Sequence, residues 1–495
     1  MDQITGWIRD GKTPAMYRQE HPGFDTLVLM TFTGGRTDRW HSANDYVHRY
    51  PNGTLFYDFT NFTAALDWCV AGGFKLEVVL GNTPHALARP NETSIYGAFE
   101  ALTGPPANYT EYRWYVQNIT RVLVDRYGVT TASSWEYRLY TEPDGHGDDG
   151  TYGWWSGGEE GYVRLWNETF SILKAALPAA RLVLGNMIDV TEPAFAGYVI
   201  SRINAINATL LPDVVSFSYY NDLVNPPKAQ DLVHKFDGLE RYLDGLGTGK
   251  QFALSVEEGF IINDENGNYL GGDGTEIGAA WMAWMIRSCH DAAGNVTRFT
   301  HWGTNMDEYL LPSGYVQLMA ARMAGEQRIE VAMDYRNPLL QPDHMLVDGI
   351  ASKNTGGTHF AAILYQFLPS RDMRRTATVD ARLAGLPTGT YNVTTCTVDK
   401  DHHNFFTKWL ADTAAFPVVS GASRYNRDPS VLDIPGGCWI YWWNWRHDPV
   451  NVALNTKRLT ASSVATVVVT GTGPVAVPIT LESSSVVLVE CTRIA

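Results

Sequence analysis

The chain has 495 residues, too many for one ordinary hydrophobic core but enough for a barrel of about 250 residues or more and a smaller domain. Hydrophobic residues make up 45% of the chain and charged residues 18%, which excludes disorder over the chain as a whole. The formal net charge is −15, which argues against nucleic acid as a partner, because binding a polyanion needs a basic surface.

Short apolar runs alternate with longer segments of helical period from about residue 25 to residue 305. This alternation predicts an α/β fold, a (β/α)8 TIM barrel over residues 1–325, in which parallel strands are joined by helical crossovers. An eighth strand is expected before Thr26, although residues 1–24 offer no run for it. The seven visible strands are expected at 26–32, 75–80, 135–140, 182–184, 214–218, 252–256 and 299–302. The helices are expected at 61–70, 111–127, 161–177, 194–206, 232–246, 277–289 and 312–323.

The pattern changes after about residue 326. Helical periods end, and Val/Thr alternation separated by Gly/Pro turns takes over. The runs 358–367, 375–379, 389–398 and 464–489 predict strands, and residues 326–495 are therefore expected to form an antiparallel β-sandwich domain.

Glutamates follow two of the predicted barrel strands. Glu142 comes after the strand 135–140 and before a proline, and Glu257 and Glu258 come directly after the strand 252–256. Active sites of parallel barrels lie at the carboxyl ends of the strands. Glycoside hydrolysis needs one protonated carboxyl group for the leaving oxygen and one carboxylate that attacks the anomeric carbon. Two such strand ends favour a glycosidase over surface glutamates held in salt bridges.

The segment Trp135–Asp144 resembles the W-E-x-x-x-N-E-P motif of retaining glycosidases with (β/α)8 barrels. Further segments follow the order found in glycoside hydrolase family 39, which holds β-xylosidases and α-L-iduronidases. The resemblance covers about residues 25–420. These further segments are 56–59, 73–80, 84–88, 112–128, 386–393 and 398–404, with Trp409 beyond them.

The resemblance implies that Glu142 is the general acid/base and that Glu257 or Glu258 is the nucleophile. The order apolar, acidic, nucleophile favours Glu258, whereas the spacing Glu-x-Gly favours Glu257. Successive residues of a strand face opposite ways, so only one of the two can point at the sugar. The resemblance also implies that Tyr220 orients the nucleophile, although a buried aromatic residue of the core would give the same pattern.

The remaining candidates for substrate binding are polar or aromatic residues near the strand ends, and ordinary core burial is the alternative for each. Two positions depart from the family pattern: Thr141 stands where an asparagine normally binds the sugar 2-OH, and Ser218 stands where a histidine is usual. These departures predict either a substrate that differs at that carbon or an activity that is weakened or lost. The substrate-binding candidates are Asn82, His85, Thr141, Trp154, Trp155, Tyr220 and Trp302.

We therefore expect a retaining, β-xylosidase-like glycoside hydrolase with a carbohydrate substrate, no cofactor and no metal. The alternative is a catalytically inactive glycosidase-like glycoprotein with a structural role outside the cell or at its surface.

No cysteine lies in a metal-ligand spacing, and one disulfide is expected among the last three. The five cysteines are Cys69, Cys289, Cys396, Cys438 and Cys491.

Nine N-x-T sequons predict passage through a secretory pathway, N-linked glycans and a secreted or cell-surface protein. A surface rich in Asn and Thr is the alternative explanation. No apolar run reaches the ~18 residues of a membrane span. The first 12 residues lack the apolar region of a signal peptide, so the signal is expected to have been removed or the chain to start late. The sequons begin at Asn52, Asn61, Asn91, Asn108, Asn118, Asn167, Asn207, Asn295 and Asn392.

Overall fold

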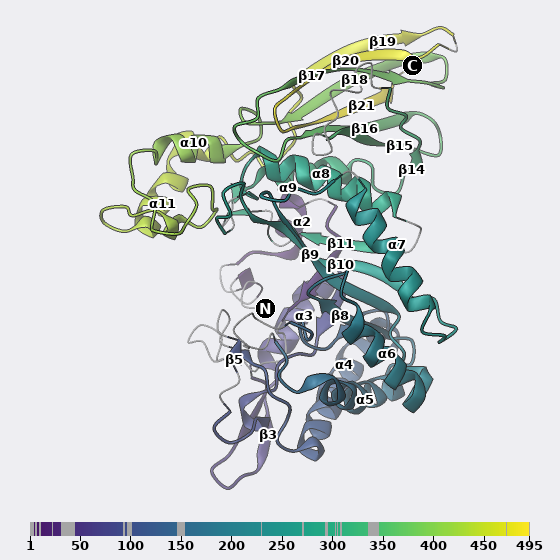
Figure 1. The fold of residues 1–495 in the computed structure, drawn as a ribbon, viewed down its shortest axis with the longest axis vertical. Helices are drawn as coiled ribbons and strands as arrows, with labels where there is room; N and C mark the ends of the chain where they lie inside the picture. Colours follow the sequence, from purple (N-terminus) through teal and green to yellow (C-terminus); the bar gives the residue numbers. More distant parts are fainter. Residues whose placement is uncertain are drawn as a thin grey trace.

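Figure 1 shows a barrel, coloured from purple to teal, beside a β-rich domain in green and yellow, with a small helical unit around α10 and α11 at its flank. This computed structural model describes residues 4, 7–8, 11–21, 23–30, 45–92, 95–96, 101–145, 154–228, 230–269, 272–292, 296–301, 303, 305–306, 309–334, 346–471 and 473–494.

The barrel is built on one parallel sheet of seven strands that are neighbours in chain order. Both the seven predicted strands and their alternation with helices are confirmed. Among the described residues, no eighth strand pairs with this sheet, so its two edges are the first and last strands. The strands are β1 (Thr26–Leu29), β4 (Lys75–Val79), β7 (Glu136–Arg138), β8 (Arg181–Met187), β9 (Val214–Asp222), β10 (Ala253–Asn263) and β11 (Val296–His301).

The sheet curls until its two edges approach each other. Arg298 on the edge strand β11 forms ion pairs with Glu77 on β4 and Glu136 on β7, which are the second and third strands from the other edge. A cavity of about 370 Å³ lies between β1 and β11, lined by Asp25, Thr26 and residues 296–301 among others. In the described part of the chain the barrel is therefore open along this seam.

The barrel helices follow the strands as predicted, and their ends are set by capping residues. Asn108 accepts a hydrogen bond from the backbone N–H of Thr110 at 2.9 Å, and Pro312 occupies the first turn of the last barrel helix. The short helix α2 (Pro14–Glu20) precedes β1 and was not predicted. The other helices are α3 (Thr60–Ala71), α4 (Tyr109–Ser133), α5 (Gly158–Ala176), α6 (Ala194–Asn207), α7 (Asp231–Asp244), α8 (Glu276–Asp291) and α9 (Pro312–Ala321).

Short elements decorate the loops of the barrel. Among the described residues, three two-stranded antiparallel ribbons and two 3₁₀ turns lie between the larger elements of the barrel. They are β2 (Val47–Arg49) with β3 (Leu55–Tyr57), β5 (Ile95–Tyr96) with β6 (Ala101–Leu102), β12 (Asn305–Met306) with β13 (Tyr309–Leu310), η2 (His85–Leu87) and η3 (Ala208–Leu210).

The C-terminal part holds two antiparallel sheets, which confirms the predicted sandwich. Phe360 and Tyr391 from the larger sheet share one core with Leu481 from the smaller sheet. Arg287 of α8 donates to the backbone oxygen of Gly349 at 2.8 Å and so ties this part to the barrel. The larger sheet has the order β14 (Gln327–Ile329), β15 (Leu346–Lys353), β16 (His359–Phe367), β21 (Ser485–Arg493), β18 (Gly389–Val398), β19 (Ser463–Val469), and the smaller pairs β17 (Thr376–Leu383) with β20 (Val475–Glu482).

A helical unit lies between β18 and β19, and here the expectation that helical periods end after residue 326 was wrong. Its core is aromatic, with Trp409, Trp442 and Trp445 buried together. Trp439 and Trp443, on the same helix as Trp442, are more than half exposed. Aromatic residues therefore lie on both faces of this helix, and the sequence shows no helical period there. The unit comprises α10 (Phe405–Asp412), η5 (Pro429–Val431), α11 (Cys438–His447) and α12 (Pro449–Val452).

The expected disulfide is absent, because all five cysteines are free thiols. Cys396 and Cys491 do lie on adjacent strands, but Cys491 pairs with Val393 and Cys396 pairs with Leu488. The two thiols are therefore out of register, and Cys438 belongs to the separate helical unit. No described helix is long and apolar enough to cross a membrane.

Candidate active site

Glu142 lies beyond the carboxyl end of β7, in the loop that leads away from the barrel sheet. Its backbone N–H donates to the backbone oxygen of Asn186 on β8 at 2.9 Å. Its φ is +43°, a left-handed conformation that costs free energy for a residue with a side chain. Its side chain is buried, and the strained backbone and the bond to β8 fix the direction of that carboxyl group.

Glu257 and Glu258 lie within β10 and not at its end. The predicted strand stops at Val256, but the observed strand continues to Asn263. A register shift against β9 falls between Val256 and Glu258, so β10 carries a bulge at this point. Bulges re-aim side chains, and the two neighbouring buried carboxyl groups take different partners. Glu258 faces β9, whereas Glu257 joins an ion network at the centre of the barrel.

Tyr220 on β9 joins Glu142 to Glu258. Its hydroxyl oxygen lies 3.0 Å from Oε1 of Glu142 and 2.6 Å from Oε2 of Glu258. The distance between these two carboxyl oxygens therefore cannot exceed the sum of the two hydrogen-bond distances, about 5.6 Å. Residues from three regions of the chain thus bring two carboxyl groups together, one beyond the carboxyl end of β7 and one within β10, with Tyr220 of β9 between them.

Ser218 on β9 gives Glu142 a second donor. Its hydroxyl donates to Oε1 of Glu142 at 2.6 Å, and it accepts a hydrogen bond from Nδ2 of Asn186 at 2.7 Å. The departure from the family pattern at Ser218 therefore places a short hydroxyl in direct contact with the carboxyl group of Glu142.

The carboxyl pair retains protons at higher pH than ordinary glutamates. Burial raises the pKa of Glu142, and the hydrogen bonds from Ser218 and Tyr220 oppose this rise. Burial, followed by the nearby charge of Glu142, raises the pKa of Glu258 to about 7. Two like charges at this distance do not ionise independently, so the two carboxyl groups titrate as a coupled pair. Burial also raises the pKa of the neighbouring Asp144 to about 7.

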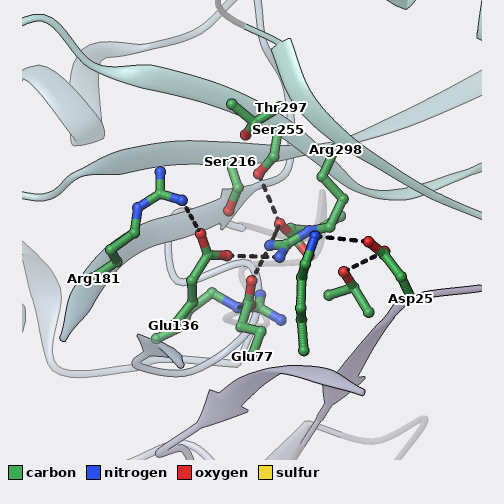
Figure 2. A network of polar contacts seen from close by, with 12 residues as sticks. Asp25, Glu77, Glu136, Arg181, Ser216, Ser255, Thr297 and Arg298 are labelled. Atoms are coloured by element: carbon green, nitrogen blue, oxygen red, sulfur yellow. Dashed lines mark hydrogen bonds and ion pairs between the residues drawn. The ribbon is translucent and has the colours of Figure 1, made fainter. Parts of the chain in front are cut away.

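Glu257 belongs to a different cluster. It accepts a hydrogen bond from the hydroxyl of Ser255 at 2.7 Å and forms an ion pair with Arg298. Figure 2 shows the guanidinium of Arg298 between the carboxyl groups of Glu136 and Glu77, with Arg181 on the far side of Glu136. Burial alone would raise the pKa of Glu257, but the charges of Arg298 and Arg138 outweigh it and lower the pKa overall.

The other predicted binding residues lie apart from this pair or have structural partners. Asn82 donates to the backbone oxygen of Leu102 at 2.7 Å, and His85 pairs with Asp45 at 2.8 Å. Trp155 is buried and donates to the backbone oxygen of Gly158.

Three further predicted residues remain. The side-chain oxygen of Thr141, beside Glu142, is buried and makes no hydrogen bond within the part of the chain that the structure describes. Trp154 is buried as well, whereas Trp302 lies outside the described residues.

Three buried polar neighbours of the pair were missed from the sequence. Arg138 and Glu77 are fully buried and ion-paired at 2.6 Å, and Asn186 lies between Arg138 and Ser218. A signal for two of them was present, because Glu77 lies inside the apolar run of 75–80 and Arg138 lies inside that of 135–140. Charges inside buried parallel strands must be paired, which indicates a polar centre to the barrel. No group of three or more His, Cys, Asp or Glu suited to a metal ion occurs among the described residues.

Comparisons with known proteins agree with this architecture. A β-xylosidase of Caldicellulosiruptor saccharolyticus is 27% identical over 127 residues, and the aligned stretch spans 26% of this chain and 25% of that protein. The chain thus matches about a quarter of the length of this curated relative.

Solved structures share the fold over nearly the whole chain. A monomeric β-xylosidase of Caulobacter crescentus has a TM-score of 0.70 at 16% identity, covering 99% of this chain and 94% of that one. A GH39 enzyme of Xanthomonas axonopodis pv. citri also has a TM-score of 0.70, at 15% identity, covering 99% and 92%. Residues 33–195 match the model of glycosyl hydrolases family 39. Together with its curated relatives, this match over part of the chain supports an assignment to glycosyl hydrolase family 39.

Proposed function

We propose that this protein is a retaining glycoside hydrolase in which Glu258 is the nucleophile and Glu142 is the general acid/base. The observation that carries the proposal is the bridge that Tyr220 makes between the two carboxyl groups. One oxygen of each therefore lies no more than about 5.6 Å from an oxygen of the other, a bound that is compatible with the ~5–5.5 Å carboxyl separation typical of retaining enzymes.

The chemistry follows from this arrangement in two steps. Glu258 attacks the anomeric carbon while Glu142 gives its proton to the leaving oxygen, so that the glycosidic bond breaks and a glycosyl ester forms on Glu258. Glu142, now ionised, removes a proton from water, and the water oxygen displaces Glu258 from the anomeric carbon. Burial supports the first step, because it raises the pKa of Glu142 and so favours the protonated form that acts as the acid.

A β-xylosidase-like substrate is the proposed default, since two curated relatives are named β-xylosidases. The catalytically inactive alternative is disfavoured because the two carboxyl groups and the bridging tyrosine are all in place. Ser218 also weakens that alternative, since its hydroxyl supplies a donor to Glu142 and so leaves the acid/base with a working partner.

A mechanism-based fluorosugar with an activated leaving group tests the proposal. We expect a covalent adduct on the peptide that carries Glu258, detected by mass spectrometry, because fluorine at C2 slows hydrolysis of the glycosyl ester. Glu258→Gln should abolish labelling, whereas Glu257→Gln should retain it in the folded fraction. An adduct on Glu257, or none with any sugar of a panel under which the protein stays folded, would contradict the assignment.

We further propose that the protein passes through a secretory pathway and carries N-linked glycans. Asn52, Asn61, Asn91 and Asn108 are exposed, as acceptor sites must be. Expression in a eukaryotic secretory host should give a product whose mass falls on treatment with an N-glycosidase, with Asn converted to Asp at these positions. An unchanged mass would contradict this proposal. The remaining sequons are half-buried at Asn118, Asn167, Asn207 and Asn392, and Asn295 lies outside the described residues.

A further inference from the structure

A continuous series of hydrogen bonds runs from the centre of the barrel to the carboxyl group of Glu142. Nε of Arg138 donates to Glu77 at 2.6 Å, and Nη1 of Arg138 donates to Oδ1 of Asn186. Nδ2 of Asn186 donates to the hydroxyl of Ser218 at 2.7 Å, and that hydroxyl donates to Oε1 of Glu142 at 2.6 Å. Every donor in the series from Arg138 onward is oriented toward Glu142.

All the side chains of this series are buried. Arg138, Asn186 and Glu77 have no exposed surface, and Ser218 is nearly as inaccessible. A buried amide with both its oxygen and its nitrogen engaged has one orientation that satisfies both neighbours, since the oxygen must face the guanidinium. The charge of Arg138 therefore fixes the amide of Asn186, and the amide leaves Ser218 with its proton directed at Glu142.

We propose that Asn186 is a positioning residue that couples the acid/base Glu142 to the buried Arg138–Glu77 ion pair through Ser218. This inference rests on the proposed hydrolytic function. A donor aimed at a carboxylate favours its ionised form, so the series opposes the rise in pKa that burial causes in Glu142. The series of hydrogen bonds therefore helps to set the pH above which Glu142 has lost its proton and can no longer act as the general acid.

The other titratable groups around Glu142 also affect its ionisation. Tyr220 contacts it from β9 and Glu258 lies on β10, while Asp144 follows it in its own loop. Tyr269 lies near enough for the charges of Glu142 and Glu258 to raise its pKa, after burial, which is the larger cause. Apart from Arg138, these neighbours are acidic or neutral, so the donors from Ser218 and Tyr220 and the charge of Arg138 are what stabilise the ionised form of Glu142.

Asn186→Asp tests the coupling with a side chain of the same shape. The carboxylate keeps Arg138 as a partner, but it no longer donates to Ser218 and it places a like charge near Glu142. Both changes raise the pKa of Glu142, so we expect the alkaline limb of kcat/KM to move up by about one pH unit. At a given pH on that limb, kcat/KM divided by the maximum of the same enzyme should then be about tenfold higher in the variant than in the wild type. KM should change little. Ser218→Ala, which removes the direct donor, should shift the limb in the same direction.

Glu136→Gln is the matched control. Glu136 pairs with Arg298 at 2.6 Å and with Arg181 at 2.7 Å, so it belongs to the same ion network but lies outside the series that ends at Glu142. Its substitution should loosen the network while leaving the position of the alkaline limb unchanged. A wild-type profile without turnover would refute the hydrolase assignment itself. An active wild type whose alkaline limb stays in place in Asn186→Asp, or moves equally in Glu136→Gln, would overturn the coupling alone.

Discussion

Glu142→Gln is expected to lower kcat/KM about 10²–10⁴-fold on glycosides with poor leaving groups, the contribution typical of general acid catalysis. Glutamine fills the same space and still accepts the hydrogen bonds of Ser218 and Tyr220, but it has no proton to give. Aryl glycosides with activated leaving groups need no proton from the enzyme for the first step. Their kcat/KM should therefore fall much less than that of unactivated substrates.

The measurement is a series of aryl glycosides with leaving groups of increasing pKa. The plot of log kcat/KM against leaving-group pKa should become steeper in Glu142→Gln, and the alkaline limb of its pH profile should disappear. Addition of azide as an external nucleophile should restore turnover of activated substrates, because the second step has lost its general base. Equal losses across the whole series would contradict the acid role of Glu142.

Periodicity in the sequence was sufficient to predict the barrel. Apolar runs of strand length alternate with helical segments, and the parallel order of the strands follows from that alternation. The helical unit around Trp442 and Trp445 escaped prediction because its core is aromatic and its exposed face is aromatic as well. The end of β10 was also misplaced, since a bulge lets the strand continue through two acidic residues.

The order of the strands in the sequence predicts that Glu142 lies near Glu257 and Glu258. It does not predict which of these two glutamates faces Glu142 as the nucleophile. Each local motif fits one of the two residues, and the bulge in β10 decides the direction of both side chains. The role of Arg298 also depends on curvature. A residue of the last strand contacts Glu77 and Glu136 only because the sheet curls, and no local pattern encodes that contact.

Glu258→Gln is expected to abolish turnover and at the same time to stabilise the protein at pH 8. Burial and the charge of Glu142 raise the pKa of Glu258 from 4.5 to about 7. The folded protein therefore holds a proton there that the unfolded chain releases, and stability is lost as the pH rises from about 4.5 to 7. At 1.36 kcal/mol per pKa unit, the penalty above pH 7 is about 3 kcal/mol.

The neighbouring Glu257→Gln should do the reverse. The pKa of Glu257 is lowered, so this carboxylate contributes stability above its ordinary pKa, and its loss leaves Arg298 with one buried partner fewer. Removing one member of a buried ion network costs about 3–5 kcal/mol. At pH 8 the Tm of Glu257→Gln should therefore fall, while that of Glu258→Gln should rise by a few degrees.

Thermal unfolding of both variants at pH 5 and pH 8 separates the two effects. The gain in Glu258→Gln should shrink toward pH 5, where the wild-type carboxyl group already holds its proton and carries no charge penalty. The loss in Glu257→Gln should persist at pH 5, because a lowered pKa keeps that group ionised. Identical shifts in Tm for the two neighbours would mean that they occupy equivalent environments, and the assignment of Glu258 as the nucleophile and Glu257 as a structural anion would lose its physical basis.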